Sequence, residues 1–228
     1  MSGYVVYGAK GSGSTAVEAA LTLIGAAFEV VERAPFDSAA DAAALAPVNP
    51  MRQVPALVLP APEGEEGELM TESAAILIHL AERHPEAGLA PAADSPLRPR
   101  FLRWMSFISA QIYALYWIRD APARLAADPA HETVLLARTA ARVSEAWATM
   151  DGQIIPAGRF LLGEKISVLD LYMTVVSRWG PRRQAFYAAA PRLAPVVRAV
   201  DAEPQLAAFW AERFPFFEGW EAEPLAGD

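Results

Sequence analysis

The sequence predicts a mixed α/β unit joined to an all-helical unit. Residues 1 to about 84 combine short β-branched runs with helical periodicity, whereas the pattern is helical almost throughout from Glu72 onward. A stretch rich in proline and alanine, 85–96, lies where a linker is expected. The 228 residues are enough for two small domains. We therefore expect a first domain over 1–84, a linker over 85–95 and a second domain over 96–228.

The first domain is expected to run strand–helix–strand, followed by a β-hairpin and a further helix. Short apolar or alternating runs predict its strands at Tyr4–Tyr7, Phe28–Glu32, Ala56–Leu59 and Glu68–Met70. A glycine–serine turn at 8–14 separates the first strand from a helix that carries Val17, Leu21 and Ile24 on one face. Four strands with one right-handed crossover predict a small mixed sheet.

The second domain is predicted to be a bundle of about five helices. Apolar residues recur at three- and four-residue spacing over 101–116 and again over 143–154, which is typical of long helices with one buried face. Ser167 and Asp170 have the spacing of a capping box at the start of an apolar helix. We expect this pair to stabilise a buried helix start and not to act in catalysis.

Composition excludes several classes of protein and site. The net charge of −8 opposes binding to nucleic acid, which needs a basic face. The absence of cysteine excludes disulfides, cysteine-ligated zinc and a cysteine nucleophile, and three histidines without an HExxH pair argue against a metal site. No apolar run is long enough to cross a membrane and no signal peptide is visible, so a cytoplasmic protein is expected.

The start of the first helix carries several hydroxyl groups. Thr15 and Glu18 have capping-box spacing, which would leave Ser12 and Ser14 in the preceding loop. Unpaired N–H groups and the helix dipole favour an anion at such a helix start. On local pattern alone, both serines could equally be ordinary loop residues.

Four segments in register resemble the glutathione S-transferase superfamily, in particular its bacterial, serine-type members. They are the strand–loop–helix start, Asn49–Leu57, Glu72–Ile76 and Ser167–Asp170. The resemblance covers essentially the whole chain. It implies a thioredoxin-like N-terminal domain, an all-helical C-terminal domain, a homodimer, and glutathione as co-substrate without a metal. It also implies a cis bond at Val54-Pro55, and a structural role for the Ser167–Asp170 pair.

The resemblance also assigns roles in binding glutathione. Glu72 and Ser73 match the pair that holds the γ-glutamyl end, which agrees with a carboxylate and a helix start facing an ammonium and a carboxylate. Val54 matches the residue whose backbone pairs with the cysteinyl part, and Pro55 would keep that backbone exposed. Gln53 matches the position that reaches toward the glycyl end. Arg52 departs from the glycine often found there, so this part of the loop is expected to differ.

Activation of glutathione needs a hydrogen-bond donor for the thiolate. Counting forward from the first strand places Ser12 at the catalytic position of many bacterial relatives. Counting back from the helix places Gly13 there, in a loop one residue longer, so that Ser14 is the next hydroxyl. Tyr7, at the strand end, is the tyrosine-type alternative. We expect Ser12 to be catalytic and Ser14 to contribute to substrate binding.

The resemblance implies transfer of glutathione to a small hydrophobic electrophile, with a role in detoxification. Tyr113, Tyr116 and Trp117 are candidates for the wall of the electrophile site, although an aromatic stripe at helical spacing can equally be bundle core. Without cysteine, the chain cannot form a mixed disulfide with glutathione. Two alternatives stay open: a non-catalytic interaction module of the same fold, and a narrow-specificity glutathione-dependent isomerase or ether-cleaving enzyme.

Overall fold

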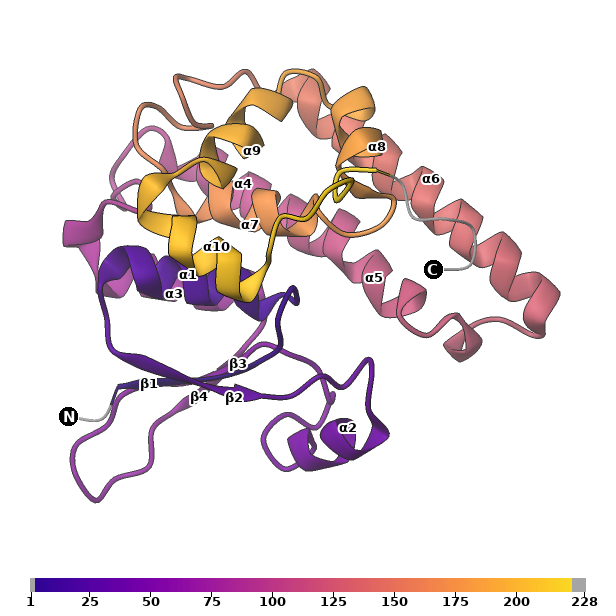
Figure 1. Ribbon diagram of the computed structural model, residues 1–228. Coiled ribbons are helices and arrows are strands. Elements are labelled where there is room, and N and C mark those ends of the chain that lie inside the picture. Colours follow the sequence, from indigo (N-terminus) through magenta and orange to yellow (C-terminus); the bar gives the residue numbers. More distant parts are fainter. Residues whose placement is uncertain (1–2, 223–228) are drawn as a thin grey trace. The chain divides into compact units, whose positions relative to one another are not determined.

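The computed structural model describes residues 3–222, which form two compact units (Figure 1). One unit comprises the chain up to Ser95 together with Asp201–Phe216, and the other comprises Pro96–Val200 with the segment from Phe217 onward. The first unit therefore contains a segment from near the C-terminus that the sequence pattern did not separate from the helical domain.

The first unit is built on a four-stranded mixed sheet, as predicted. Its strands are β1 (Tyr4–Gly8), β2 (Phe28–Glu32), β3 (Ala56–Val58) and β4 (Leu69–Thr71), in the spatial order β2-β1-β3-β4. β1 is parallel to β2 and antiparallel to β3, and β3 is antiparallel to β4. This is a thioredoxin-like arrangement, with the parallel pair joined through a crossover helix.

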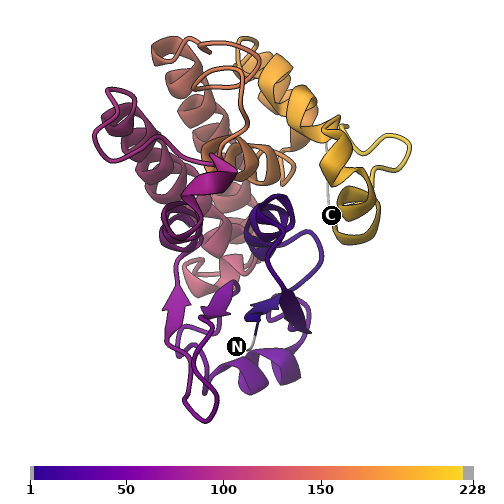
Figure 2. The ribbon, with the colours of Figure 1, turned by 90° about the vertical axis from the view of Figure 1, so that its left-hand side faces the viewer.

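Helices cover both faces of this sheet. The helices of the unit are α1 (Ser14–Ile24), α2 (Ala39–Leu45), α3 (Ser73–Arg83) and α10 (Ala207–Arg213), with 3-10 turns η1 (Pro85–Ala87) and η4 (Pro204–Leu206). α1 and α3 pack together on one face, and α2 lies on the other side (Figures 1 and 2). The side chains of Val6, Leu21, Leu57 and Ile76 are fully buried and form the core beneath α1 and α3.

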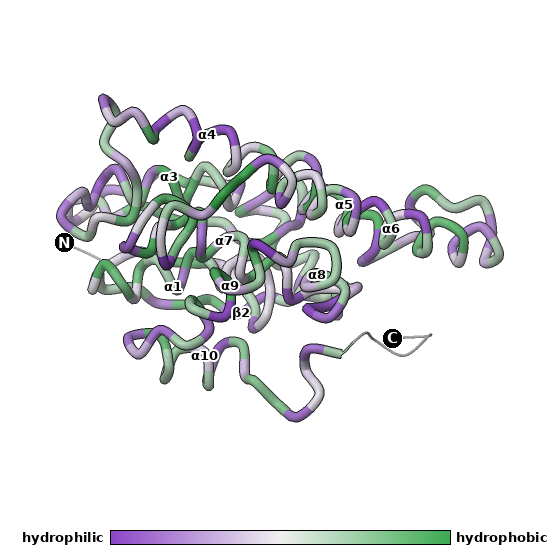
Figure 3. Tube along the Cα trace, turned by 90° about the horizontal axis from the view of Figure 1, so that it is seen from above, coloured by the Kyte–Doolittle hydropathy of each residue, from purple (hydrophilic) through white to green (hydrophobic). Residues whose placement is uncertain are grey.

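The second unit is helical, as predicted. Its elements are α4 (Arg98–Phe107), a π-helical segment η2 (Ile108–Tyr113), α5 (Ala114–Arg119), the 3-10 turn η3 (Pro122–Arg124), α6 (Pro129–Gln153), α7 (Val168–Val176), α8 (Arg182–Ala189) and α9 (Ala194–Asp201). The long helix expected over 101–116 is thus interrupted by a π-helical segment. Every residue of α7 is buried, whereas hydrophilic and hydrophobic stretches alternate along α6 (Figure 3).

The capping box at the start of α7 is confirmed. Asp170 accepts hydrogen bonds from the backbone N–H and the hydroxyl of Ser167, at 2.8 and 2.5 Å, and from the N–H of Leu161 at 2.9 Å. Burial raises the pKa of the Asp170 carboxyl to about 6, and these hydrogen bonds oppose that rise. Asp170 therefore joins the helix start to a preceding loop inside the second unit.

Two local expectations were wrong or incomplete. The predicted capping box of Thr15 and Glu18 does not form, because α1 begins two residues earlier than a cap at Thr15 requires, with Gly13 in the capping position. The Thr15 hydroxyl is buried without a hydrogen-bond partner. The short helix α2 was not predicted, since its alanine-rich sequence has no apolar stripe, and the side chain of Ser38 caps it.

Within residues 3–222 no helix has both the length and the apolar character needed to span a bilayer.

Candidate functional site

The strand register brings the three segments with predicted site residues to one end of the sheet. Tyr7 of β1 lies opposite Ala56 of β3, and Ala56 lies opposite Thr71 of β4. The loop after β1 therefore starts beside the chain that enters β3, and the chain that leaves β4 lies on the other side of β3 at the same end of the sheet. In the sequence, Ser12 comes shortly after the end of β1. Val54-Pro55 comes directly before β3, and Glu72-Ser73 comes directly after β4.

The loop between β1 and α1 folds around its two serines. The Ser12 hydroxyl oxygen accepts hydrogen bonds from the N–H groups of Ala9 and Ser14, at 3.3 and 3.2 Å, and lies 3.0 Å from the Ser14 hydroxyl. Ser12 is 7% exposed, whereas Ser14 is fully buried. Gly8 is required for this packing, because a Cβ atom there would lie 2.2 Å from the Ser14 hydroxyl oxygen.

The buried side chain of Glu18 fixes the direction of these hydroxyl protons. Ser14 donates its proton to Glu18 Oε1 at 2.6 Å, the shortest of its contacts and the one with a charged acceptor. The Ser14 oxygen is then an acceptor toward Ser12. Two N–H groups donate to the Ser12 oxygen, so its single hydroxyl proton points to Ser14 in this arrangement and must turn away from Ser14 to be donated to a ligand. A donor is the polarity that a thiolate ligand requires.

Glu18 is held in turn by Arg213, at the end of α10. Arg213 Nε lies 2.5 Å from Glu18 Oε2, and Nη2 lies 3.2 Å from Oε1. The same guanidinium also contacts Glu32 at the end of β2. Burial acts to lower the pKa of Arg213, but the hydrogen bonds that it donates to Glu18 and Glu32 outweigh burial and raise that pKa. Sequence reasoning missed this pairing, because Glu18 was interpreted only as half of a capping box and Arg213 is far away in sequence.

The loop that enters β3 is shaped by the buried side chain of Asn49. Its amide donates to the carbonyl oxygen of Gln53 at 2.8 Å and accepts from the N–H of Met51 at 3.0 Å. Arg52 has a φ of 55°, in the left-handed region that glycine favours, so the loop keeps a glycine-type backbone although the residue differs. The predicted cis bond between Val54 and Pro55 is confirmed.

The start of α3 combines an unusual backbone with a buried hydroxyl residue. Glu72 precedes the helix with a φ of 67°, while its side chain is exposed. Non-glycine residues seldom adopt this conformation, and such positions are enriched at ligand clamps. Ser73, the first residue of α3, is 6% exposed.

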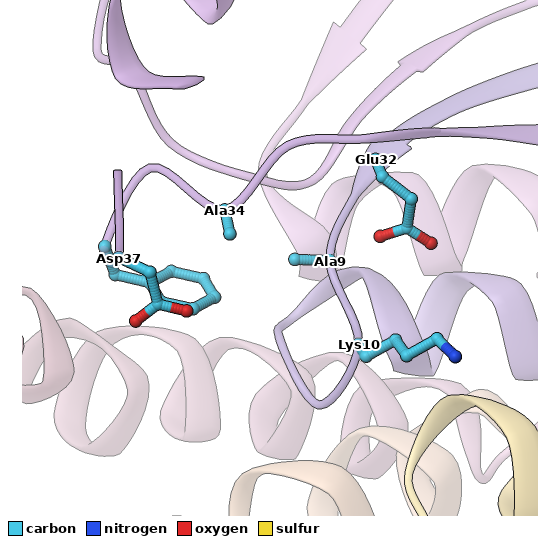
Figure 4. A pocket seen from close by; sticks show the side chains of 6 residues that line it. Ala9, Lys10, Glu32, Ala34 and Asp37 are labelled. Carbon is cyan, nitrogen blue, oxygen red and sulfur yellow. The ribbon is translucent and has the colours of Figure 1, made fainter. Parts of the chain in front are cut away.

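A pocket of about 380 Å³ lies beside the β1–α1 loop, at the same end of the sheet (Figure 4). Ala9 and Lys10 from that loop and Glu32 from β2 line one part of it, and Ala34, Phe36 and Asp37 complete it. The parallel register of β1 and β2 explains this neighbourhood, since Gly8 lies opposite Glu32. The positively charged side chain of Lys10 and the negatively charged side chains of Glu32 and Asp37 therefore lie next to the β1–α1 loop.

The three aromatic candidates of the second unit differ in their surroundings. Tyr113, in the π-helical segment, stacks on Tyr172 with ring centroids 6.0 Å apart. Tyr116 is buried edge-to-face against Trp179, and its hydroxyl has no hydrogen-bond partner. Burial raises the pKa of Tyr116. Trp117 is 38% exposed and lies beneath the guanidinium of Arg124.

No group of three histidine, aspartate or glutamate side chains suited to a metal ion occurs among the described residues.

Comparison with known proteins agrees with this architecture. The family model described as "Glutathione S-transferase, N-terminal domain" matches residues 6–88. A GST-like protein of Escherichia coli K12, YncG, is 30% identical over 202 residues, which are 88% of this chain and 94% of the relative.

Solved structures give the same result. A sphingomonad glutathione S-transferase in complex with glutathione is 29% identical with a TM-score of 0.68, and the match covers 90% of this chain and 96% of that one. A glutathione transferase homologue from Sulfitobacter, with bound glutathione, has a TM-score of 0.78 at 23% identity, over 92% of this chain and 97% of that one. Because the YncG match spans nearly the whole of both chains, the protein belongs to the glutathione S-transferase family.

Proposed function

We propose that the protein is a glutathione transferase of serine type, which ionises glutathione through Ser12 and transfers it to a small hydrophobic electrophile. The observation that carries the proposal is the strand register, in which Tyr7, Ala56 and Thr71 are aligned. This alignment brings the three segments with candidate site residues to one end of the sheet. The structural neighbours that were solved with bound glutathione support a tripeptide ligand for this chain.

The tripeptide would be held by groups from two of these segments. Ser73 and the N–H groups at the start of α3 suit its γ-glutamyl carboxylate, and Glu72 suits its ammonium group. The backbone of Val54 would pair with the cysteinyl part, and Gln53 would reach toward the glycyl end. In this arrangement Ser14 acts indirectly, by supporting Ser12, since its own hydroxyl is fully buried.

Ser12 can supply the free energy that thiolate formation needs. A free thiol has a pKa of about 8.5, and lowering it by two units requires roughly 2.7 kcal/mol of preference for the anion. A hydrogen bond to a charged group contributes about 1.5–3 kcal/mol. One donated hydrogen bond, aided by the dipole at the start of α1, is therefore sufficient.

Ser12→Ala is expected to raise the pKa of the bound glutathione thiol by about one to two units, with little change in affinity, because only the thiolate loses a donor. The measurement is a pH titration of thiolate ultraviolet absorbance in the complex. Ser106→Ala, at an exposed serine of α4, serves as the matched control and should titrate like the parent protein. An unchanged pKa in Ser12→Ala would exclude Ser12 as the donor and would direct attention to Tyr7.

The function itself is tested by binding followed by turnover. The protein should be retained on immobilised glutathione and should conjugate a chlorinated nitrobenzene. Absence of binding would overturn the proposal, and binding without turnover of any electrophile would favour an interaction module. Substitution of Trp117, the exposed member of the three aromatic candidates, should change the KM for the electrophile but not for glutathione.

We further propose that the protein is a cytoplasmic homodimer, as the family resemblance implies. Light scattering of the purified chain tests the dimer, and cell fractionation tests the location.

A further inference from the structure

The end of helix α10 contacts the loop between β1 and α1 (residues 9–13) and the start of α1 in three ways. The N–H of Gly11 donates to the carbonyl oxygen of Arg213 at 3.0 Å. Gly11 has a φ of 70°, and the ring of Phe214 lies 3.2 Å from the position that a Cβ atom would take there. The guanidinium of Arg213 is bound to Glu18, which accepts the proton of Ser14. Backbone, packing and charge contacts thus converge on a loop of a few residues.

The Glu18 carboxylate matters for any anion at this loop. It is fully buried, and a chain of two hydrogen bonds connects it to the hydroxyl of Ser12. A buried negative charge only two hydrogen bonds away from Ser12 opposes formation of a thiolate at Ser12, since water screens the buried charge poorly. Arg213 is the cation that contacts Glu18 directly, with two nitrogen atoms.

The remaining charged groups around this pair are better screened. Glu32, which also contacts Arg213, has a side chain that is 53% exposed. Lys10, Asp37 and Glu212, which line the adjoining pockets, are exposed. Glu18 and Arg213 are thus buried charged side chains of opposite sign within the hydrogen-bond network of the serines.

We propose that Arg213 is a positioning residue for glutathione activation: it neutralises the buried Glu18 and anchors the β1–α1 loop, so that Ser12 can stabilise a thiolate. This inference rests on the proposed function. It makes activation of the glutathione thiol depend in part on α10, although α10 lies about 200 residues away in sequence from the β1–α1 loop that it contacts.

The test compares the two partners of the ion pair. Arg213→Met should raise the pKa of the bound glutathione thiol by about one unit, a tenfold lower thiolate-to-thiol ratio, because Glu18 is left uncompensated. Glu18→Gln should lower that pKa, because the opposing charge disappears while the amide oxygen still accepts from Ser14. The double variant should titrate close to the parent protein. Loss of loop packing would shift the thiol pKa in the same direction in both single variants. Shifts in opposite directions can therefore not result from loss of packing.

Two further variants complete the design. Arg142→Met removes an arginine of an exposed ion pair with Glu145 and should leave the thiol pKa unchanged. Arg213→Lys keeps the charge but loses the two-nitrogen contact, and its thiol pKa should lie between those of the parent and Arg213→Met. If Arg213→Met does not fold, the lysine and the double variant carry the comparison.

The possible results separate the two proposals. A parent protein that binds glutathione with a lowered thiol pKa, together with folded Arg213 and Glu18 variants that titrate identically to it, would overturn the role of Arg213 and leave the proposed function intact. A rise of the pKa in both single variants would overturn the charge argument in the same way. A parent protein that binds no glutathione, or binds it with an unshifted thiol, would overturn the proposed function and this inference with it.

Discussion

Asp170→Ala is expected to lower the free energy of unfolding by about 3–5 kcal/mol, because it leaves three buried donors without their acceptor. The donors are the hydroxyl and N–H of Ser167 and the N–H of Leu161. Each unsatisfied buried group costs roughly 1–3 kcal/mol. The side chain is fully buried, so water cannot replace the lost acceptor without opening the start of α7. Urea unfolding followed by tryptophan fluorescence measures the effect.

Asp128→Ala is the matched control for this substitution. Asp128 also caps a helix, accepting from the N–H of His131 at 2.8 Å at the start of α6, but it does so at an exposed position. Its loss should cost only about 1 kcal/mol. Equal costs for the two variants would contradict the view that burial of Asp170, and not capping as such, makes the site critical.

The contribution of Asp170 should also depend on pH. Its folded-state pKa of about 6 lies above the ordinary value of 3.8, because burial disfavours the charged form. The folded protein therefore binds this proton first as the pH falls, and the carboxyl stabilises the fold increasingly between pH 6 and 4. That contribution is lost as the pH rises through 6.

Comparison with Asp170→Asn isolates this single group. The difference in the free energy of unfolding between the parent protein and Asp170→Asn should be about 1 kcal/mol larger at pH 5 than at pH 7. A difference that shrinks toward pH 5 would mean that the hydrogen bonds from Ser167 and Leu161 outweigh burial and hold the folded-state pKa below its ordinary value.

Local patterns predicted the parts of the structure that local interactions determine. The strand predicted at Tyr4–Tyr7 follows from a β-branched run bounded by glycine, the strand at Phe28–Glu32 follows from alternating residues, and the capping box at Ser167 follows from the spacing of two residues. The cis bond at Pro55 is different, because nothing in the nearby sequence raises its frequency. It was predicted from the resemblance to the family alone.

Interactions between distant residues were not visible in the sequence. Glu18 has the right spacing to complete a capping box with Thr15, but Arg213 and Ser14 offer it stronger partners, and the helix starts elsewhere. No periodicity could connect α10 to the first unit, since its apolar positions look like those of any other bundle helix. The same reason explains why the segment Asp201–Phe216 was assigned to the helical domain.

Asn49→Ala is expected to weaken glutathione binding roughly tenfold or more, although Asn49 itself need not touch the ligand. Its side chain bridges Met51 and Gln53, and so holds the loop that presents the backbone of Val54. Without the bridge the loop must be ordered on binding, and fixing one residue costs about 1–2 kcal/mol. A tenfold loss of affinity corresponds to about 1.4 kcal/mol, so one loosened residue suffices. Calorimetric titration with glutathione measures the change.

Two neighbouring substitutions separate this effect from general damage to the loop. Met51 has a side chain that is 67% exposed, and Met51→Ala should bind glutathione like the parent protein. Arg52→Gly should also retain affinity, because glycine adopts the observed φ of 55° without strain. If Asn49→Ala folds and binds glutathione as tightly as these controls, the backbone of Val54 is either held by other contacts or not part of the binding site. Asn49 donates to the carbonyl oxygen of Gln53 and is therefore the side chain placed to hold the chain directly before Val54.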